Sequence, residues 1–106
     1  MKQYTTPEQT AKLIELGFEK PKASHRYWRG NELIINNNYS IGELIEMLMT
    51  IKGVRISFVS MFGDRLALIV KRLVDDKWDI LYGKVENESI DLLFDAIVKL
   101  KEEGVI

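Results

Sequence analysis

Residues 20–29 form the densest group of side chains suited to binding a charged ligand. This decapeptide contains lysines and arginines, no acidic residue and two adjacent aromatic residues. Such a composition neutralises phosphates and stacks bases in proteins that bind single-stranded nucleic acid. The candidate nucleic-acid-binding residues are Lys20, Lys22, Arg26, Tyr27, Trp28 and Arg29. In the alternative interpretation, Tyr27 and Trp28 alternate along a strand so that one faces the core, while the arginines protect its edge.

A single histidine, His25, lies in the same decapeptide. A histidine titrates near neutral pH and can act as a general base or a proton shuttle. Spacing assigns His25 no partner, and no Gly-x-Ser-x-Gly nucleophile motif occurs in the chain. We therefore interpret His25 as a surface residue, and we expect no catalytic residues and no enzymatic activity.

Two acidic groups have side chains of the kind that bind calcium or magnesium. Asp75 and Asp76 lie near Asp79, and Glu86 lies near Glu88. Neither group has the spacing of an EF-hand loop. Turn formation accounts for the first group, and the positive end of a helix dipole accounts for the second. We expect no metal, no cofactor and no small-molecule substrate.

A surplus of apolar residues predicts a protein-binding surface. The candidate residues are Met47, Val59, Met61, Ile69 and Leu81. Methionine side chains repack easily against a partner. The alternative is that helices inside the chain cover both faces of the central sheet. If one face stays uncovered, we expect it to bind another protein or a second copy of this chain.

The elements that position these residues are built around the stretch 54–82. Three runs rich in β-branched and aromatic residues, 54–58, 66–70 and 78–82, predict strands that alternate buried and exposed positions. Tight turns at 62–65 and 74–77 predict antiparallel neighbours. The even-numbered positions are expected to face the core: Val54, Ile56, Phe58, Leu66, Leu68, Val70, Trp78, Ile80 and Tyr82.

Helices are expected on both sides of this stretch. Thr6 with Gln9, and Ser40 with Glu43, have the spacing of capping boxes, and each predicts the start of a helix. Apolar residues at helical spacing predict a third helix at about 88–103. The glycines that suit the helix ends are Gly17, Gly53 and Gly104. We expect the first helix to be a lid on the sheet.

A hairpin is predicted between the first and second helices. Gly30 and Asn31 suit a two-residue turn between strands at 26–29 and 32–35. These strands either extend the later sheet or pack separately. The predicted fold is therefore one α+β domain over residues 1–106, in the order α-(β-β)-α-β-β-β-α, with an antiparallel sheet of three to five strands.

Length, composition and charge limit the classes of protein to consider. The 106 residues predict a radius of gyration of roughly 13 Å for a compact domain. The net charge of −1 gives no long-range attraction to nucleic acid or acidic membranes. No apolar run approaches the roughly 20 residues of a membrane-spanning helix, and the chain has no cysteine. We expect a cytoplasmic protein.

Three stretches of the chain resemble a group of small uncharacterised proteins encoded in prophages and mobile elements of gut anaerobic bacteria. They are residues 4–21, the helix 39–48 with its Tyr-Ser-Ile-Gly-Glu-Leu start, and the end 93–106. The resemblance implies an accessory protein of phage or mobile-element origin in a bacterial cytoplasm. It implies no catalytic residues, because the shared features are helix caps and apolar stripes.

Overall fold

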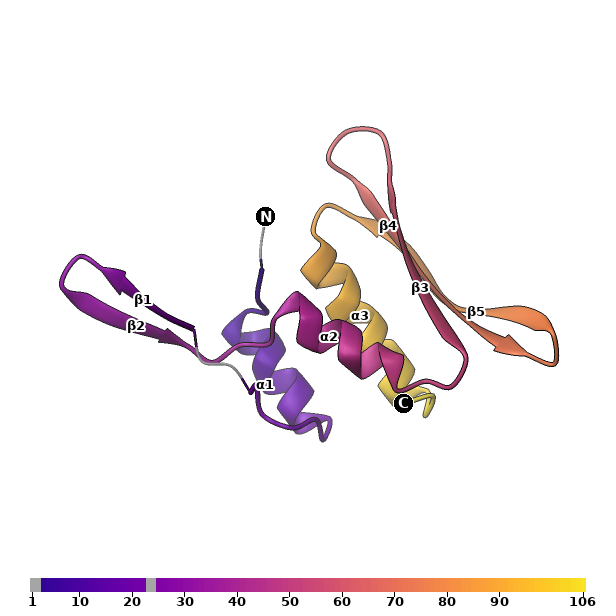
Figure 1. The fold of residues 1–106 in the computed structure, drawn as a ribbon, viewed down its shortest axis with the longest axis horizontal. Helices are drawn as coiled ribbons and strands as arrows, with labels where there is room; N and C mark the ends of the chain where they lie inside the picture. Colours follow the sequence, from indigo (N-terminus) through magenta and orange to yellow (C-terminus); the bar gives the residue numbers. More distant parts are fainter. Residues whose placement is uncertain (1–2, 23–24) are drawn as a thin grey trace.

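The computed structural model describes residues 3–22 and 25–106, without the side chains of residues 25–27 and 34–36. Figure 1 shows the three helices and two antiparallel sheets. In chain order the elements are α1 (Pro7–Glu15), β1 (His25–Arg29), β2 (Glu32–Asn36), α2 (Ile41–Met49), β3 (Val54–Ser60), β4 (Leu66–Val74), β5 (Lys77–Glu86) and α3 (Ser89–Glu102). The predicted α+β class and element order are confirmed.

Both predicted capping boxes are present at the helix starts. The Thr6 hydroxyl accepts a hydrogen bond from the Gln9 amide at 3.1 Å, and the Gln9 side chain accepts one from the Thr6 amide at 2.9 Å. Ser40 and Glu43 make the same reciprocal pair at the start of α2, with both distances 3.2 Å. These bonds satisfy amide groups that have no partner inside the helix.

The ends of α1 and α3 are closed by the chain folding back. Phe18 donates its amide to the Leu13 carbonyl at 3.1 Å, and Gly17 between them has a φ of +100°. The amide of Val105 binds the Leu100 carbonyl in the same way at 2.9 Å. Glycine adopts this left-handed conformation without the steric cost of a Cβ, so the sequence fixes where the helix stops.

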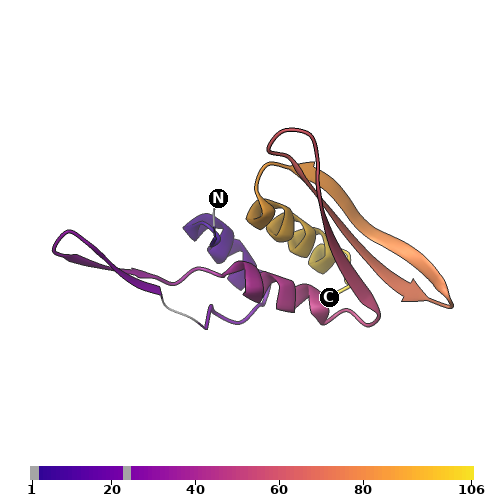
Figure 2. The same cartoon turned by 45° about the horizontal axis from the view of Figure 1, so that its top comes forward.

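All three helices lie on one side of the β3–β4–β5 sheet (Figure 2). Strand β4 is the central strand of this sheet, with β3 and β5 at its edges. Helices α2 and α3 contact the strands. Helix α1 lies on the far side of α3 from the sheet in Figures 1 and 2, where Gln9 donates to Asp91 of α3 at 2.9 Å. The expectation that the first helix covers the sheet is wrong, because α3 occupies that place.

The core lies between the sheet and the helices. Strands β4 and β5 contribute Leu68, Val70 and Tyr82 to it. Helix α3 is buried over most of its circumference, since Leu92 and Ala96 are buried as well as Ile90, Leu93, Ile97 and Leu100. The other buried hydrophobic residues are Leu13, Tyr39, Leu44, Leu48 and Ile51.

A β-bulge in the β4–β5 pair changes which residues of β5 face the core. Val70 pairs with Tyr82, but Lys71 pairs with Ile80, so Leu81 is an extra residue on β5. Inserting one residue reverses the alternation of all positions beyond it. Trp78 and Ile80 therefore point away from the helices, and the prediction that they face the core is wrong.

The β1–β2 hairpin forms with the predicted turn at Gly30 and Asn31, where Gly30 has a φ of +64°. It makes a separate two-stranded sheet and does not extend the larger one. Figures 1 and 2 show it projecting from the side of the molecule opposite β3–β4–β5. The projection contributes to extents of 56 × 35 × 17 Å and to a radius of gyration of 15.2 Å, larger than the compact value predicted from length.

Within the described residues, no helix combines the length and the apolar character required to cross a bilayer.

Candidate functional site

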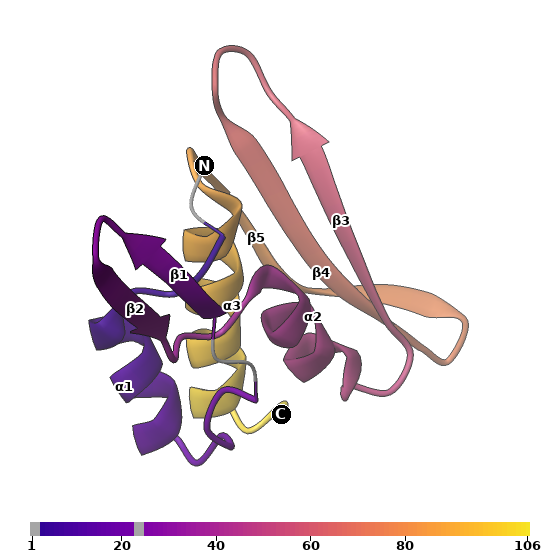
Figure 3. The same ribbon diagram turned by 60° about the vertical axis from the view of Figure 1, so that its left-hand side comes forward.

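Within the described residues, no helix covers the side of the β3–β4–β5 sheet opposite α2 and α3, and we call this side the outer face (Figure 3). Its composition follows from the strand register, because directly paired residues point to the same side. The outer-face residues are Arg55, Ser57, Val59, Ala67, Ile69, Lys71, Leu73, Trp78, Ile80, Gly83 and Val85.

Trp78 is at the centre of the most exposed part of the outer face. Its side chain is 46% exposed and that of Ile80 is 69% exposed. Leu73, directly paired with Trp78, is also exposed. The ammonium of Lys71 lies 4.7 Å from the centroid of the Trp78 ring, and the guanidinium carbon of Arg55 lies 5.4 Å from it. Both distances are within the range of cation–π attraction.

Every charged residue on the outer face is basic. Arg55 and Lys71 are directly paired across β3 and β4. The acidic residues of β5, Asp79 and Glu86, pair with Arg72 and Leu66 and so point to the helix side. There Asp79 approaches the Arg72 Nε atom at 3.5 Å. The outer face thus combines exposed apolar side chains with an uncompensated positive charge.

The five predicted protein-binding residues do not all meet on this face. Ile69 and Val59 are on it, and Met61 follows β3 directly and is 47% exposed. Leu81 is the bulge residue and packs against the core. Met47 also packs against the core, from α2.

Strand alternation alone missed Trp78, Ile80 and Leu73 as outer-face residues. The even-position pattern placed Trp78 and Ile80 in the core, and only the bulge reverses them. The local sequence carries no signal of this reversal, because Trp78 and Ile80 alternate with Lys77 and Asp79 as in a strand that buries its apolar face.

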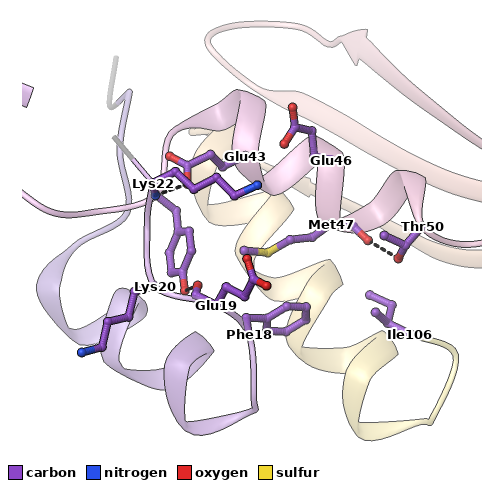
Figure 4. A pocket seen from close by; sticks show the side chains of 10 residues that line it. Phe18, Glu19, Lys20, Lys22, Glu43, Glu46, Met47, Thr50 and Ile106 are labelled. Carbon is purple, nitrogen blue, oxygen red and sulfur yellow. Dashed lines mark hydrogen bonds between the residues drawn. The ribbon is translucent and has the colours of Figure 1, made fainter. Parts of the chain in front are cut away.

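A pocket of about 300 Å³ lies between the segment after α1, helix α2 and the end of the chain (Figure 4). Phe18, Met47 and Ile106 give it an apolar lining, and Glu19 and Glu46 are among its charged residues. Tyr39 donates its hydroxyl proton to the Glu19 carbonyl at this pocket. Burial, with the nearby carboxylates of Glu43 and Glu19, raises the pKa of Tyr39. Its phenol is therefore a neutral hydrogen-bond donor and not a base.

The six candidate nucleic-acid-binding residues are divided between two places. Lys20 and Lys22 line the pocket, where the Lys22 amide donates to Glu43 at 3.2 Å. Trp28 and Arg29 lie near the tip of the hairpin, and Trp28 is 70% exposed. The side chains of Arg26 and Tyr27 lie outside the described residues, as does that of His25.

The acidic residues near 75–79 and 86–88 have structural positions. Asp75 and Asp76 have φ values of 51° and 64°, and they form the two-residue turn between β4 and β5. Glu88 is the residue that precedes α3. Within residues 3–22 and 25–106, no three His, Cys, Asp or Glu side chains converge on a possible metal site.

No protein-family model, curated protein or solved structure matches this chain. Its function must be inferred from its own residues. Among the described surfaces, the outer face combines the largest exposed apolar side chains of the sheet with charge of a single sign, and this combination is typical of a binding surface.

Proposed function

We propose that this chain is a small non-enzymatic accessory protein that binds another protein through the outer face. The partner surface on this proposal is apolar and acidic. The observation that carries the proposal is the exposed cluster of Trp78, Ile80 and Leu73. It lies beside two cations, Arg55 and Lys71, on a face where the strands place no acidic residue. The resemblance to prophage and mobile-element proteins supports a bacterial cytoplasm as the setting.

The chemistry of the outer face supports a protein partner. Tryptophan and arginine dominate the binding energy at protein–protein interfaces, because they combine large apolar area with directed polar groups. Trp78 holds Arg55 and Lys71 close to its ring, which limits the side-chain freedom that binding must remove. A carboxylate of the partner can then bind either cation at the edge of the apolar contact.

Charge argues against a second copy of this chain as the occupant. Stacking two outer faces would bring Arg55 and Lys71 of both copies together without any acidic residue of the strands on that side. Like charges in a desolvated contact are strongly unfavourable. An acidic partner removes this cost, and it also gains from attraction during encounter.

A synthetic peptide that alternates glutamate with leucine tests the proposal. In a Trp28→Phe background, Trp78 is the one remaining tryptophan, so its fluorescence reports directly on the outer face. We expect saturable binding that weakens as salt is added. Arg55→Glu combined with Lys71→Glu should reduce the affinity about tenfold or more.

The matched control is Lys20→Glu combined with Arg29→Glu, which changes the net charge equally at residues away from the outer face. We expect this control to bind like the parent. A peptide with lysine in place of glutamate should not bind. Equal affinity for both peptides, or equal weakening by both double variants, would show that the outer face does not select an acidic partner.

A second candidate function, nucleic-acid binding by the hairpin, is favoured by the exposure of Trp28. The alternative interpretation of the decapeptide placed one of its aromatic rings in the core. Trp28 is not that ring, because it is 70% exposed, and its cross-strand partner Leu33 is exposed as well. The side chain of Tyr27 lies outside the described residues. An exposed ring next to Arg29 on a projecting hairpin suits base stacking beside a phosphate.

Fluorescence anisotropy of a labelled single-stranded oligonucleotide tests this second function. If the hairpin binds, affinity should fall linearly on a logarithmic scale with salt. Trp28→Ala should then weaken binding by about 1 to 3 kcal/mol, while Trp78→Ala should leave it unchanged. Absence of binding at low ionic strength would exclude this function.

A further inference from the structure

The hydrogen bonds between β3 and β4 show which residues of β3 direct their backbone groups to its free edge. Leu73 donates its amide to the Gly53 carbonyl at 3.0 Å, and Met61 donates to Arg65 at 2.8 Å. In an antiparallel pair, alternate residues exchange hydrogen bonds with the neighbouring strand. The odd residues of β3 therefore bond to β4. The even residues, such as Ile56 and Phe58, direct their amide and carbonyl groups to the free edge.

The two edges of the three-stranded sheet differ in their protection against pairing. Strand β5 contains the bulge and four charged residues, Lys77, Asp79, Lys84 and Glu86. Charges and bulges prevent another strand from adding to an edge. Strand β3 has an unbroken register over seven residues and one charged residue, Arg55. Figure 3 shows β3 at the side of the sheet that faces away from α3.

We propose that β3 pairs with β3 of a second copy of this chain, antiparallel and about a twofold axis at Ser57, to make one continuous six-stranded sheet. This inference concerns the edge of the sheet, and it goes beyond the proposed binding of an acidic partner on the outer face. We infer a second copy as the partner because β3 is complementary to itself in this arrangement.

The twofold axis at Ser57 satisfies the free backbone groups and produces favourable side-chain pairs. Ile56 lies opposite Phe58 of the second copy, so the even residues of both strands exchange hydrogen bonds. Ile56 with Phe58 is a β-branched and aromatic pair, which stabilises neighbouring strands. Arg55 lies opposite Val59, so the two arginines are not in contact.

The exposure of Phe58 supports this pairing. Phe58 is on the helix side of β3, where its neighbour Leu68 is fully buried, yet it is 39% exposed. A second β3 strand would place Ile56 beside it. The pairing thus covers apolar surface that the single chain leaves open, and it joins two outer faces on the same side of one sheet.

Cysteine cross-linking tests the axis directly, because the chain contains no cysteine of its own. In Ser57→Cys the two cysteines would be directly opposite in a non-hydrogen-bonded pair, with Cα atoms about 4.5 Å apart. This separation suits a disulfide. The matched control, Val59→Cys, lies on the same face of the same strand, but its two copies would be about 13 Å apart along the strands.

We expect Ser57→Cys to form a disulfide-linked dimer on mild oxidation, and Val59→Cys to remain a single chain. Light scattering of the wild type should give twice the 12.3 kDa mass of one chain. Ser57→Lys and Ser57→Glu should each be monomeric, and their equimolar mixture should dimerise, because the axis places residue 57 against itself. A monomeric wild type, or equal cross-linking of both cysteine variants, would overturn the β3 pairing. Neither result would alter peptide binding on the outer face, which the Arg55 and Lys71 variants test separately.

Discussion

Tyr82 and Trp78 are four residues apart on β5, and their side chains lie on opposite faces of the sheet. The Tyr82 side chain is buried, and its hydroxyl donates to Asp95 of α3 at 2.8 Å. Trp78 is exposed and contacts cations. Substitutions at the two positions should therefore separate folding from binding.

Tyr82→Phe should lower the free energy of unfolding by about 1 kcal/mol, the usual net value of one hydrogen bond. Asp95 keeps its ion pair with Lys84 at 3.2 Å, so the carboxylate is not left without a partner. Urea unfolding at pH 7 measures this loss. A loss above about 3 kcal/mol would show that the ring, and not the hydrogen bond, has been disturbed.

The pH dependence of Tyr82→Phe has a predictable sign. Burial, followed by the hydrogen bond to Asp95 and the charges of Asp95 and Glu86, raises the pKa of Tyr82 above its usual value near 10. Above pH 10 the unfolded chain therefore binds fewer protons than the folded chain, and the free energy of unfolding falls as pH rises. In Tyr82→Phe this fall should be shallower. Parallel curves between pH 9 and 11 would contradict the assignment.

At the scale of the elements, the two faces of the sheet should respond differently to truncation. Leu68→Ala removes a fully buried side chain from the helix side, and it should cost about 2 to 5 kcal/mol. Ile80→Ala removes a side chain that is 69% exposed, and the change should stay within about 0.5 kcal/mol. Thermal and urea unfolding compare the pair. A large cost at Ile80 would mean that another part of the chain covers the outer face.

The turn between β4 and β5 offers a stabilising substitution. Asp75 and Asp76 both have positive φ, a conformation that costs a non-glycine residue free energy. Replacing them by Asn-Gly, the preferred pair for this turn, should raise the free energy of unfolding by about 1 kcal/mol. The measurement is the urea midpoint at an unchanged slope. A lower midpoint would mean that the aspartates make a contact that the turn geometry does not explain.

The elements differ in how well the sequence predicts them. The starts of α1 and α2 are determined by the local sequence, because Thr6 and Ser40 each accept a hydrogen bond from the residue three positions later. The face on which each β5 side chain lies is not determined by the local sequence. It depends on Leu81 being bulged opposite Lys71, which requires the register of two strands. For the same reason, the predicted site included Val59 and Ile69 but omitted Trp78.

At the scale of the whole molecule, the chain is extended by the hairpin that projects from its helical side. Cross-strand pairing of His25 with Asn36 brings the base of the hairpin together. Among the described side chains, none of the hairpin belongs to the core cluster or packs against it. The sequence predicted the hairpin from its turn, but composition could not indicate whether it joins the larger sheet.

Replacing residues 26–35 by an Asn-Gly turn should therefore leave the rest of the fold intact. Because His25 and Asn36 are already paired, the shorter turn closes the same gap. We expect a cooperative unfolding transition, with a change in free energy below about 1 kcal/mol. A broad, non-cooperative transition would show that the hairpin stabilises the core.

The central claim is that the outer face of β3–β4–β5 is the binding surface, and amide chemical shifts measured during titration test it most directly. With the glutamate–leucine peptide, we predict saturable shifts at Arg55, Lys71, Leu73, Trp78 and Ile80. The hairpin and the residues lining the pocket near Met47 should keep their shifts. Shifts confined to the hairpin or to that pocket, or no shifts at all, would contradict the claim.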